Sequence, residues 1–199
     1  MDTHVSCRRV HDPEAEGYYD VPLLIHGRSI LKPVKHENGL GGITLEETLM
    51  PPFSKNLDEC PDEPQSTFDT TNWAYFMAFD GNKPVGGATV ASRTVGVTLL
   101  AGRDDLAVLW DLRVLPGYRR RRVGTVLFDM AAAWAREQGL GQMKIECQNS
   151  NVAACKFYVS RGATLCAYDE YVYAQSPSLR HEIQLIWYVD LAPLHEDDA

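Results

Sequence analysis

The sequence predicts an α/β (mixed α+β) protein, in which one central mixed, mostly antiparallel sheet of about six or seven strands has helices on both faces. Two observations lead to this fold class. Apolar runs of strand length, separated by turn signals, fill the second half of the chain, and two segments between them repeat their apolar residues at helical spacing. The resulting order combines hairpins with strand–helix–strand crossovers, and this combination places antiparallel and parallel neighbours in one sheet.

Residues 1–40 show no regular apolar pattern, so we expect an irregular N-terminal segment with at most one helical turn at 21–25. The loose alternation at 43–49 predicts a first strand. Residues 54–71 then lose apolar periodicity and gather acidic side chains and two prolines. That composition predicts an acidic, flexible loop within one domain rather than a linker between two domains.

A hairpin is expected next, because apolar runs at 73–79 and 84–91 flank the turn signal Asp80-Gly81-Asn82-Lys83. The strand predicted at 106–114 is apolar at nearly every position, as in a strand that is covered on both faces. Helical spacing marks residues 123–138. The other expected elements are strands at 143–147, 164–173 and 183–191 and a helix at 151–161.

The composition suits one globular domain over residues 1–199, because 45% of the residues are hydrophobic and 23% are charged. No apolar run approaches the roughly 18 residues of a membrane span, and the N-terminus has no signal-type run, so we expect a cytoplasmic protein without membrane partners. The formal net charge of −8 disfavours nucleic-acid binding and suits a cationic substrate. Five scattered cysteines without metal-ligand spacing predict no metal site.

A basic turn joins the strand at 106–114 to the helix at 123–138. It contains four consecutive arginines at 119–122, followed closely by Gly124. A turn that leads into a helix start offers unpaired amide N–H groups and the positive end of the helix dipole, so it can bind a pyrophosphate. The charge run alone would also suit a docking patch for another macromolecule, but its place between a strand and a helix favours the phosphate site.

This turn resembles the acetyl-CoA signature of the GNAT superfamily of N-acetyltransferases, Arg/Gln-x-x-Gly-x-Gly/Ala, which follows a strand ending in Val-x-Pro. Arg119 and Gly124 match the signature. Arg120 and Arg122 depart from it, because glycine is common at both positions. An arginine can still offer its backbone N–H to a phosphate there if its φ stays negative.

A second block strengthens the resemblance. Phe157-Tyr158, followed by Gly162-Ala163, is similar to the superfamily's Phe-Tyr-x-x-x-Gly-Phe block, with alanine in place of the last aromatic residue. The preceding Asn149-Ser150-Asn151 matches a turn that many members carry before this helix. The two blocks make residues 106–163 the expected acetyl-CoA-binding core of a GNAT fold.

The resemblance implies acetyl-CoA as co-substrate and no metal. The pantetheine chain would pair with the strand at 112–114, where a backbone N–H can polarise the thioester carbonyl. Tyr158 matches the tyrosine that protonates the departing thiolate as general acid, although the residue type alone would also suit a buried core tyrosine. The expected cofactor-binding residues are Leu112, Arg113, Val114, Arg119, Arg120, Arg121, Arg122, Val123, Gly124, Thr125, Asn151, Ala154 and Tyr158.

A general base is also required, because an alkyl amine is almost fully protonated at neutral pH. Glu146 and Asp111 are the two candidates, since each is a carboxylate inside an apolar strand, where an unpaired charge would be costly. Either residue could instead have a structural role, capping a turn or pairing with an arginine such as Arg113.

A longer match runs from Glu146 through Asn149-x-Asn151 and Tyr158 to Thr164-Leu165, and then includes Asp169, Tyr173 and Glu182 near Trp187-Tyr188. On these residues the chain is most similar, within the superfamily, to the streptothricin acetyltransferases, which acetylate an amino group in the β-lysine part of a cationic antibiotic. The resemblance implies a pocket for a small cationic amine, to which Trp110, Glu146, Asp169 and Glu182 are the expected contributors. Trp110 stands where those enzymes tend to have an acidic residue. Acetylation of another small amine or of a protein amino group, a non-catalytic acyl-CoA-binding module, and homodimer formation stay open.

Overall fold

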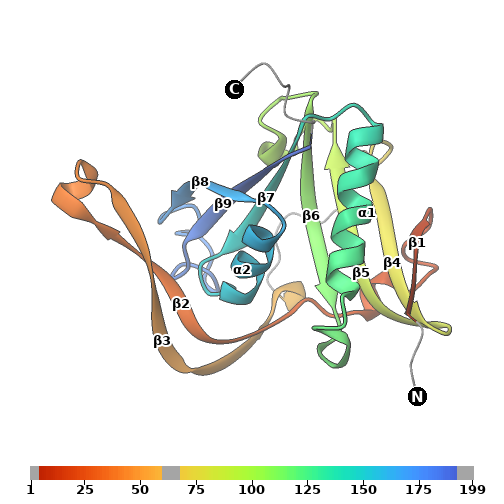
Figure 1. Cartoon of the computed structure of the whole chain (residues 1–199), viewed down its shortest axis with the longest axis horizontal. Coiled ribbons are helices and arrows are strands. Elements are labelled where there is room, and N and C mark those ends of the chain that lie inside the picture. Colours follow the sequence, from red (N-terminus) through yellow and green to blue (C-terminus); the bar gives the residue numbers. More distant parts are fainter. Residues whose placement is uncertain (1–4, 60–67, 192–199) are drawn as a thin grey trace.

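The protein, described from a computed structural model over residues 5–59 and 68–191, is built on a seven-stranded sheet (Figure 1). The strand order is β1-β4-β5-β6-β7-β9-β8, and every neighbouring pair is antiparallel except β6 and β7. The predicted fold class is therefore confirmed. The strands are β1 (Val5–Val10), β4 (Ala74–Asp80), β5 (Lys83–Ser92), β6 (Leu106–Val114), β7 (Gln142–Gln148), β8 (Thr164–Asp169) and β9 (Gln184–Asp190).

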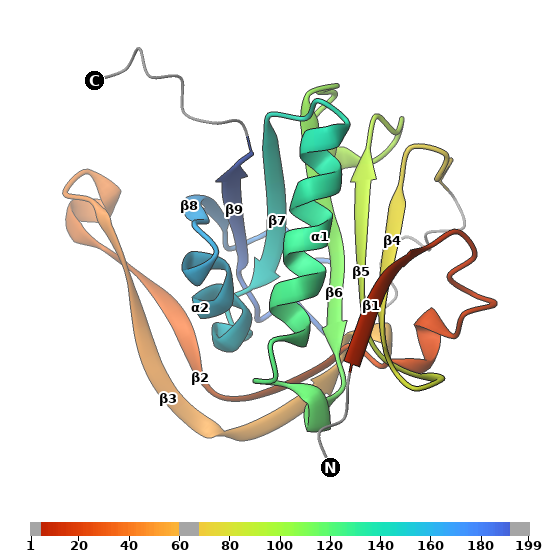
Figure 2. The same cartoon turned by 45° about the vertical axis from the view of Figure 1, so that its right-hand side comes forward.

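Two α-helices, α1 (Val123–Glu137) and α2 (Val152–Ser160), pack on the same face of this sheet, as Figures 1 and 2 show. The rings of Phe128 on α1 and Phe157 on α2 meet edge to face, with 5.7 Å between their centroids. We expected helices on both faces. Both α-helices lie on one face, and the other face carries short 3-10 helices. These are η1 (Tyr18–Asp20) and η5 (Thr98–Leu100).

The main core lies between the sheet and the two α-helices. Alternate strand residues point into it, as the two-residue period of a strand requires: Met143, Ile145 and Cys147 of β7 are all buried there. The helix ends match their sequence signals. The side chain of Asn151 caps α2 by accepting the N–H of Ala154 at 3.3 Å.

The expectation of an irregular segment at 1–40 is wrong. Residues 5–10 form β1 at the sheet edge, and β2 (Leu24–Lys35) pairs with β3 (Ile43–Asn56) in a separate two-stranded ribbon. Figure 1 shows this ribbon extending away from the sheet. Most of its side chains are exposed or half-buried, so they do not need the alternation of apolar and polar residues that reveals a strand in a sequence.

Other predicted boundaries also change. The first strand does not end at Leu49 but continues through the prolines to Asn56, so residues 54–56 belong to β3 rather than to the predicted loop at 54–71. The 3-10 helix η3 (Leu57–Glu59) follows, and residues 60–67 of that loop lie outside the described residues. The strand expected at 164–173 ends at Asp169, and the chain that follows forms a series of turns.

Strands β6 and β7 separate halfway along their length. They pair in parallel only from Leu106 with Gln142 to Leu109 with Ile145. At this level the pairing of β6 with β5 shifts by one residue, since Thr89 pairs with Asp111 and the next residue of β5 pairs with Leu109. A bulge of this kind bends a strand. Beyond it, the edge of β6 that faces β7 has no strand partner in the described chain.

No helix in residues 5–59 and 68–191 combines the length and apolar character that a bilayer span would need.

Candidate active site

A cleft of about 470 Å³ opens where β6 leaves β7. Its walls come from the end of β6, the start of α1, helix α2 and the chain that leads into β2. Most of the predicted cofactor residues lie here, including Tyr158 on α2. The residues that line it are Leu23, Leu24, Ile25, His26, Leu112, Arg113, Val114, Arg119, Arg120, Arg122, Gly124, Thr125, Asn151, Ala153, Ala154, Phe157 and Tyr158.

Two predicted cofactor residues do not line the cleft. Val123 is buried in the core with only 3% of its surface exposed. The guanidinium of Arg121 lies over the ring of Tyr118, 5.5 Å from its centroid. The four arginines of the turn are therefore not equivalent, and Arg119, Arg120 and Arg122 are those that face the cleft.

The basic turn has the backbone of a glycine-rich loop although it contains arginines. Arg120 and Arg122 have φ values of 61° and 66°, in the left-handed region that favours glycine. The condition of a negative φ, stated above for an arginine in this turn, is therefore not met at either residue. Arg122 is the N-cap residue of α1, and no side chain in the described part of the protein caps that helix start. The first amides of α1 are thus available to an anion at the mouth of the cleft.

Arg119 fastens this turn to the two strands beside it. Its Nε donates to the carbonyl of Val114 at 3.1 Å, and its Nη2 donates to the carbonyl of Leu24. The side chain is half-buried, and burial lowers its pKa. Since these two backbone carbonyls occupy the guanidinium, we expect Arg119 to position the turn and the start of β2.

Tyr158 forms part of the cleft wall with 7% of its surface exposed. Its ring packs against Phe157 with 5.7 Å between the centroids. Burial raises the pKa of Tyr158 well above its ordinary value, and the nearby thiols of Cys147 and Cys155 add to this effect. The phenol is therefore protonated at neutral pH, as a proton donor to a departing thiolate must be.

Asp111 and Arg113 form a buried ion pair on the face of the sheet opposite the α-helices. The Nε of Arg113 donates to Oδ2 of Asp111 at 2.7 Å, and the two side chains are 5% and 4% exposed. Burial raises the pKa of Asp111, and the guanidinium opposes that shift. For Arg113, burial acts to lower the pKa, but the Asp111 carboxylate outweighs it and raises the pKa. The other Asp111 oxygen, Oδ1, is buried without a hydrogen-bond partner among the described residues.

Arg113 connects this pair to the segment that covers it. Its Nη1 donates to the carbonyl of Val21 at 2.8 Å, its Nη2 lies 3.2 Å from Oδ1 of Asp58, and its guanidinium lies over the ring of Tyr18 at 5.0 Å. Asp58 also accepts the N–H of Leu23 at 2.8 Å. The pair therefore joins β6, η1 and the start of β2, which indicates a structural role for Asp111.

Glu146 is the first residue of β7 beyond its pairing with β6. Its neighbours Ile145 and Cys147 belong to the core under the helices, so Glu146 points to the opposite face. One carboxylate oxygen accepts a hydrogen bond from the hydroxyl of Tyr173. Tyr158 and Glu146 thus lie on the two faces of the sheet at the level where β6 and β7 separate.

The other expected substrate residues all have protein partners. Trp110 packs with Trp73 and Phe68, at centroid distances of 5.1 and 5.7 Å. Asp169 caps a turn by accepting the N–H of Tyr171 at 2.7 Å. The last one, Glu182, accepts a hydrogen bond from Nζ of Lys55 at 2.5 Å and another from the hydroxyl of Ser150.

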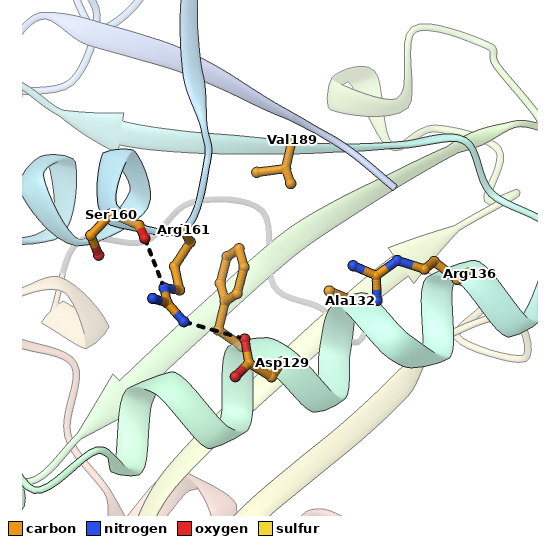
Figure 3. Close-up of a pocket in the computed structure, with 7 residues that line it drawn as sticks. Asp129, Ala132, Arg136, Ser160, Arg161 and Val189 are labelled. Atoms are coloured by element: carbon orange, nitrogen blue, oxygen red, sulfur yellow. Dashed lines mark hydrogen bonds and ion pairs between the residues drawn. The ribbon is translucent and has the colours of Figure 1, made fainter. Parts of the chain in front are cut away.

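A smaller hollow of about 380 Å³ lies between α1, α2 and β9 (Figure 3). Arg161 from the end of α2 points across it toward Asp129 on α1, with 3.6 Å between Nη1 and Oδ1. It contains none of the predicted site residues, so the larger cleft remains the candidate site. The described residues contain no group of three or more His, Cys, Asp or Glu side chains that could hold a metal ion.

The sequence prediction missed one wall of the cleft, formed by residues 23–26. They are far from the signature in the chain and lie in the segment that we expected to be irregular. Tyr173, the partner of Glu146, was assigned to a strand. The resemblance to the streptothricin acetyltransferases includes Tyr173, but it did not indicate the contact with Glu146.

Comparisons with known proteins agree with this geometry. The sequence profile of the acetyltransferase (GNAT) family matches residues 43–163. Streptothricin acetyltransferase A of Bacillus subtilis is 28% identical over 186 residues, which cover 94% of this chain and 95% of that protein. A streptothricin acetyltransferase of Escherichia coli is 31% identical over 103 residues, covering 51% and 59% of the two chains.

Solved structures show the same fold. The crystal structure of nourseothricin acetyltransferase superposes with a TM-score of 0.73 at 24% identity, covering 94% of this chain and 99% of that one. A Bacillus anthracis str. Ames protein designated a streptothricin acetyltransferase, solved in complex with acetyl coenzyme A, gives the same TM-score at 22% identity and the same coverage.

Replacing Arg122 by glycine should raise the free energy of unfolding by up to about 1 kcal/mol, because glycine adopts a positive φ without the steric cost that a side chain carries. Arg121→Gly is the matched control, since it removes the same charge at a residue whose φ is not positive. That change should lower the free energy of unfolding by about 0.5–1 kcal/mol. Chemical denaturation measures both, and equal effects would contradict strain at Arg122.

Replacing Asp111 by alanine should lower the free energy of unfolding by about 3–5 kcal/mol, because it leaves the buried charge of Arg113 without its main partner. Asp105→Ala serves as the control. It breaks the ion pair between Arg103 and Asp105, whose side chains are 37% and 63% exposed, respectively. It should lower the free energy of unfolding by less than about 1 kcal/mol. A small effect of Asp111→Ala in urea unfolding would show that the pair does not anchor the segment above it.

Proposed function

The chain belongs to the acetyltransferase (GNAT) family and is an N-acetyltransferase, and from this premise we propose that it transfers the acetyl group of acetyl-CoA to an amino group of streptothricin-type antibiotics. One observation carries the proposal. Among residues 5–59 and 68–191, no strand pairs with the β7-facing edge of β6 at 112–114 and no side chain caps the start of α1, and the cleft beside both contains Tyr158. An extended chain with a pyrophosphate at one end fits such a site.

The residues of the cleft suggest how the co-substrate binds. The open edge of β6 offers backbone groups to the amides of pantetheine, and a backbone N–H at 112–114 polarises the thioester carbonyl. The amides that begin α1 bind the pyrophosphate, supported by the exposed charges of Arg120 and Arg122. The chain that leads into β2 covers the cleft from the other side.

In the proposed reaction, Glu146 takes a proton from the ammonium group of the substrate. The amine nitrogen then attacks the thioester carbon directly, a C–N bond forms, and the C–S bond breaks. Tyr158 gives its proton to the departing thiolate. The second proton, which the nitrogen loses as the amide forms, restores the Tyr158 phenol, and Glu146 returns its proton to solvent. The base and the acid lie on opposite faces of the sheet, so the amine approaches from one face while the thiolate is released toward the helices.

Several features support a cationic substrate. The chain has a net charge of −8. Glu146 does not line the cleft itself, but it is the first residue of β7 beyond the pairing with β6 and points away from the helices. The Bacillus subtilis and Escherichia coli relatives are both streptothricin acetyltransferases, and the first of them aligns over nearly the whole chain. We choose Glu146 rather than Asp111 as the base, because the Asp111 carboxylate is already neutralised by Arg113.

We expect acetyl-CoA turnover with streptothricin well above the hydrolysis background, measured as thiol release across a panel of amines that includes polyamines and a peptide N-terminus. Turnover of another amine at higher kcat/KM than streptothricin would overturn the substrate assignment but leave the acetyltransferase mechanism. Acetyl-CoA binding without turnover of any amine would instead indicate a non-catalytic binding module.

Replacing Tyr158 by phenylalanine should lower kcat by about 10²–10⁴-fold, the usual contribution of a general acid, and leave the Kd for acetyl-CoA nearly unchanged. Since burial raises the pKa of Tyr158, this group should cause no loss of wild-type activity below about pH 10. Tyr171→Phe removes a hydroxyl from an exposed ring and should have no effect. An unchanged kcat in Tyr158→Phe would exclude Tyr158 as the acid.

A further inference from the structure

The loop between β8 and β9, residues 170–183, is folded as a series of turns. It follows Asp169, the last residue of β8, whose carboxylate accepts hydrogen bonds from the N–H groups of Tyr171 and Val172 at 2.7 and 3.1 Å. Two of its side chains are buried, Tyr173 and Leu179, at 9% and 2% exposure. A surface loop that buries an aromatic side chain is held against the body at that point.

The hydroxyl of Tyr173 lies on β7, within a short chain of hydrogen bonds. It donates to Oε1 of Glu146, and it accepts from Nε2 of Gln148 at 3.5 Å. Glu146 and Gln148 are two residues apart on one strand, so they point to the same face. Tyr173 therefore spans both side chains on the face that is opposite the α-helices.

A second contact fixes the other end of the loop. Glu182 accepts hydrogen bonds from Lys55 of β3 and from Ser150, which precedes α2. The next residue, Ile183, donates its N–H to Oδ1 of Asn149 at 2.9 Å. Because the loop is held at both ends, the Tyr173 hydroxyl has a defined position relative to β7.

This arrangement has a chemical consequence for a base. A carboxylate that removes a proton needs one oxygen directed at the amine, and a hydrogen bond to the other oxygen restricts its rotation. A hydroxyl that donates to a carboxylate also favours the charged form over the protonated form.

We propose that Tyr173 is the positioning residue for the general base Glu146, and that the loop at 170–183 serves to hold its hydroxyl there. The inference rests on the proposed function, in which Glu146 is the base. The other ionisable groups of the neighbouring elements include three carboxylates, each of which is paired with a cation. The groups are Lys144 of β7, Tyr188 of β9, Asp111 with Arg113 of β6, Asp58 of η3, and Lys55 of β3 with Glu182 of the loop.

The test compares Tyr173→Phe with the wild type, using acetyl-CoA and streptothricin from pH 5.5 to 9. The variant keeps the ring, so the loop should remain packed, and thermal unfolding checks this. We expect the midpoint of the acid limb of kcat/KM to move upward by about one pH unit, and kcat at its maximum to fall by roughly three- to tenfold. The Kd for acetyl-CoA should stay within about twofold of the wild type. Tyr171→Phe, two residues away and exposed, should leave the pH profile unchanged.

A second measurement separates positioning from loop packing. In the Glu146→Gln background, Tyr173→Phe should have little further effect, because the carboxylate that it positions is absent. The role of Tyr173 would be overturned if Tyr173→Phe lowered kcat by the same factor in the Glu146→Gln background as in the wild type. It would also be overturned if Tyr173→Phe alone left the acid limb of kcat/KM unmoved. In either case, turnover by the wild type would leave the proposed function intact. If the wild type acetylates no amine, the proposed function itself has failed.

Discussion

The separation of β6 from β7 is the constraint on which the site depends. The two strands pair over only four residue pairs, and the bulge opposite Thr89 then turns β6 away. Beyond that point β6 stays paired with β5, but its edge toward β7 has no strand partner among the described residues, and unsatisfied backbone groups in a dry interior are costly. A donor molecule that extends along the free edge would satisfy the exposed groups, and its reactive end would lie where the two faces meet.

Two features keep this opening in place. On one face, the Asp111–Arg113 pair binds β6 to η1 and to the start of β2 through the contacts of Arg113 with Val21 and Asp58. On the other, α2 supports the cleft wall through the packing of Phe157 on Phe128. The turn between β6 and α1 is strained at Arg120 and Arg122. Such strain persists only where the surrounding structure holds it, and here Arg119 bonds the turn to Val114 and Leu24.

The sequence predicted the part of the molecule in which local pattern and burial agree. The hairpin of β4 and β5, strand β6 and helices α1 and α2 carry the periodicity of elements packed against a core, and their predicted positions match the structure within a few residues. In the ribbon of β2 and β3, alternation revealed only residues 43–49 of β3, because strands with two largely uncovered faces need no alternation. The positive φ values of Arg120 and Arg122 were also out of reach, since arginine gives no sign of left-handed backbone. The partners of Glu146 and Glu182 depend on a loop whose fold is fixed by long-range contacts.

The central claim is that the donor enters between β6 and β7 from the helix face while the amine arrives from the other face. A crystal structure of the protein with CoA and streptothricin bound tests it most directly. We predict that the CoA sulfur lies within hydrogen-bond reach of the Tyr158 hydroxyl, and that the reactive amine lies beside Glu146 on the opposite face. An amine bound on the same face as α1 and α2, or a pantetheine chain outside the gap between the two strands, would contradict the claim.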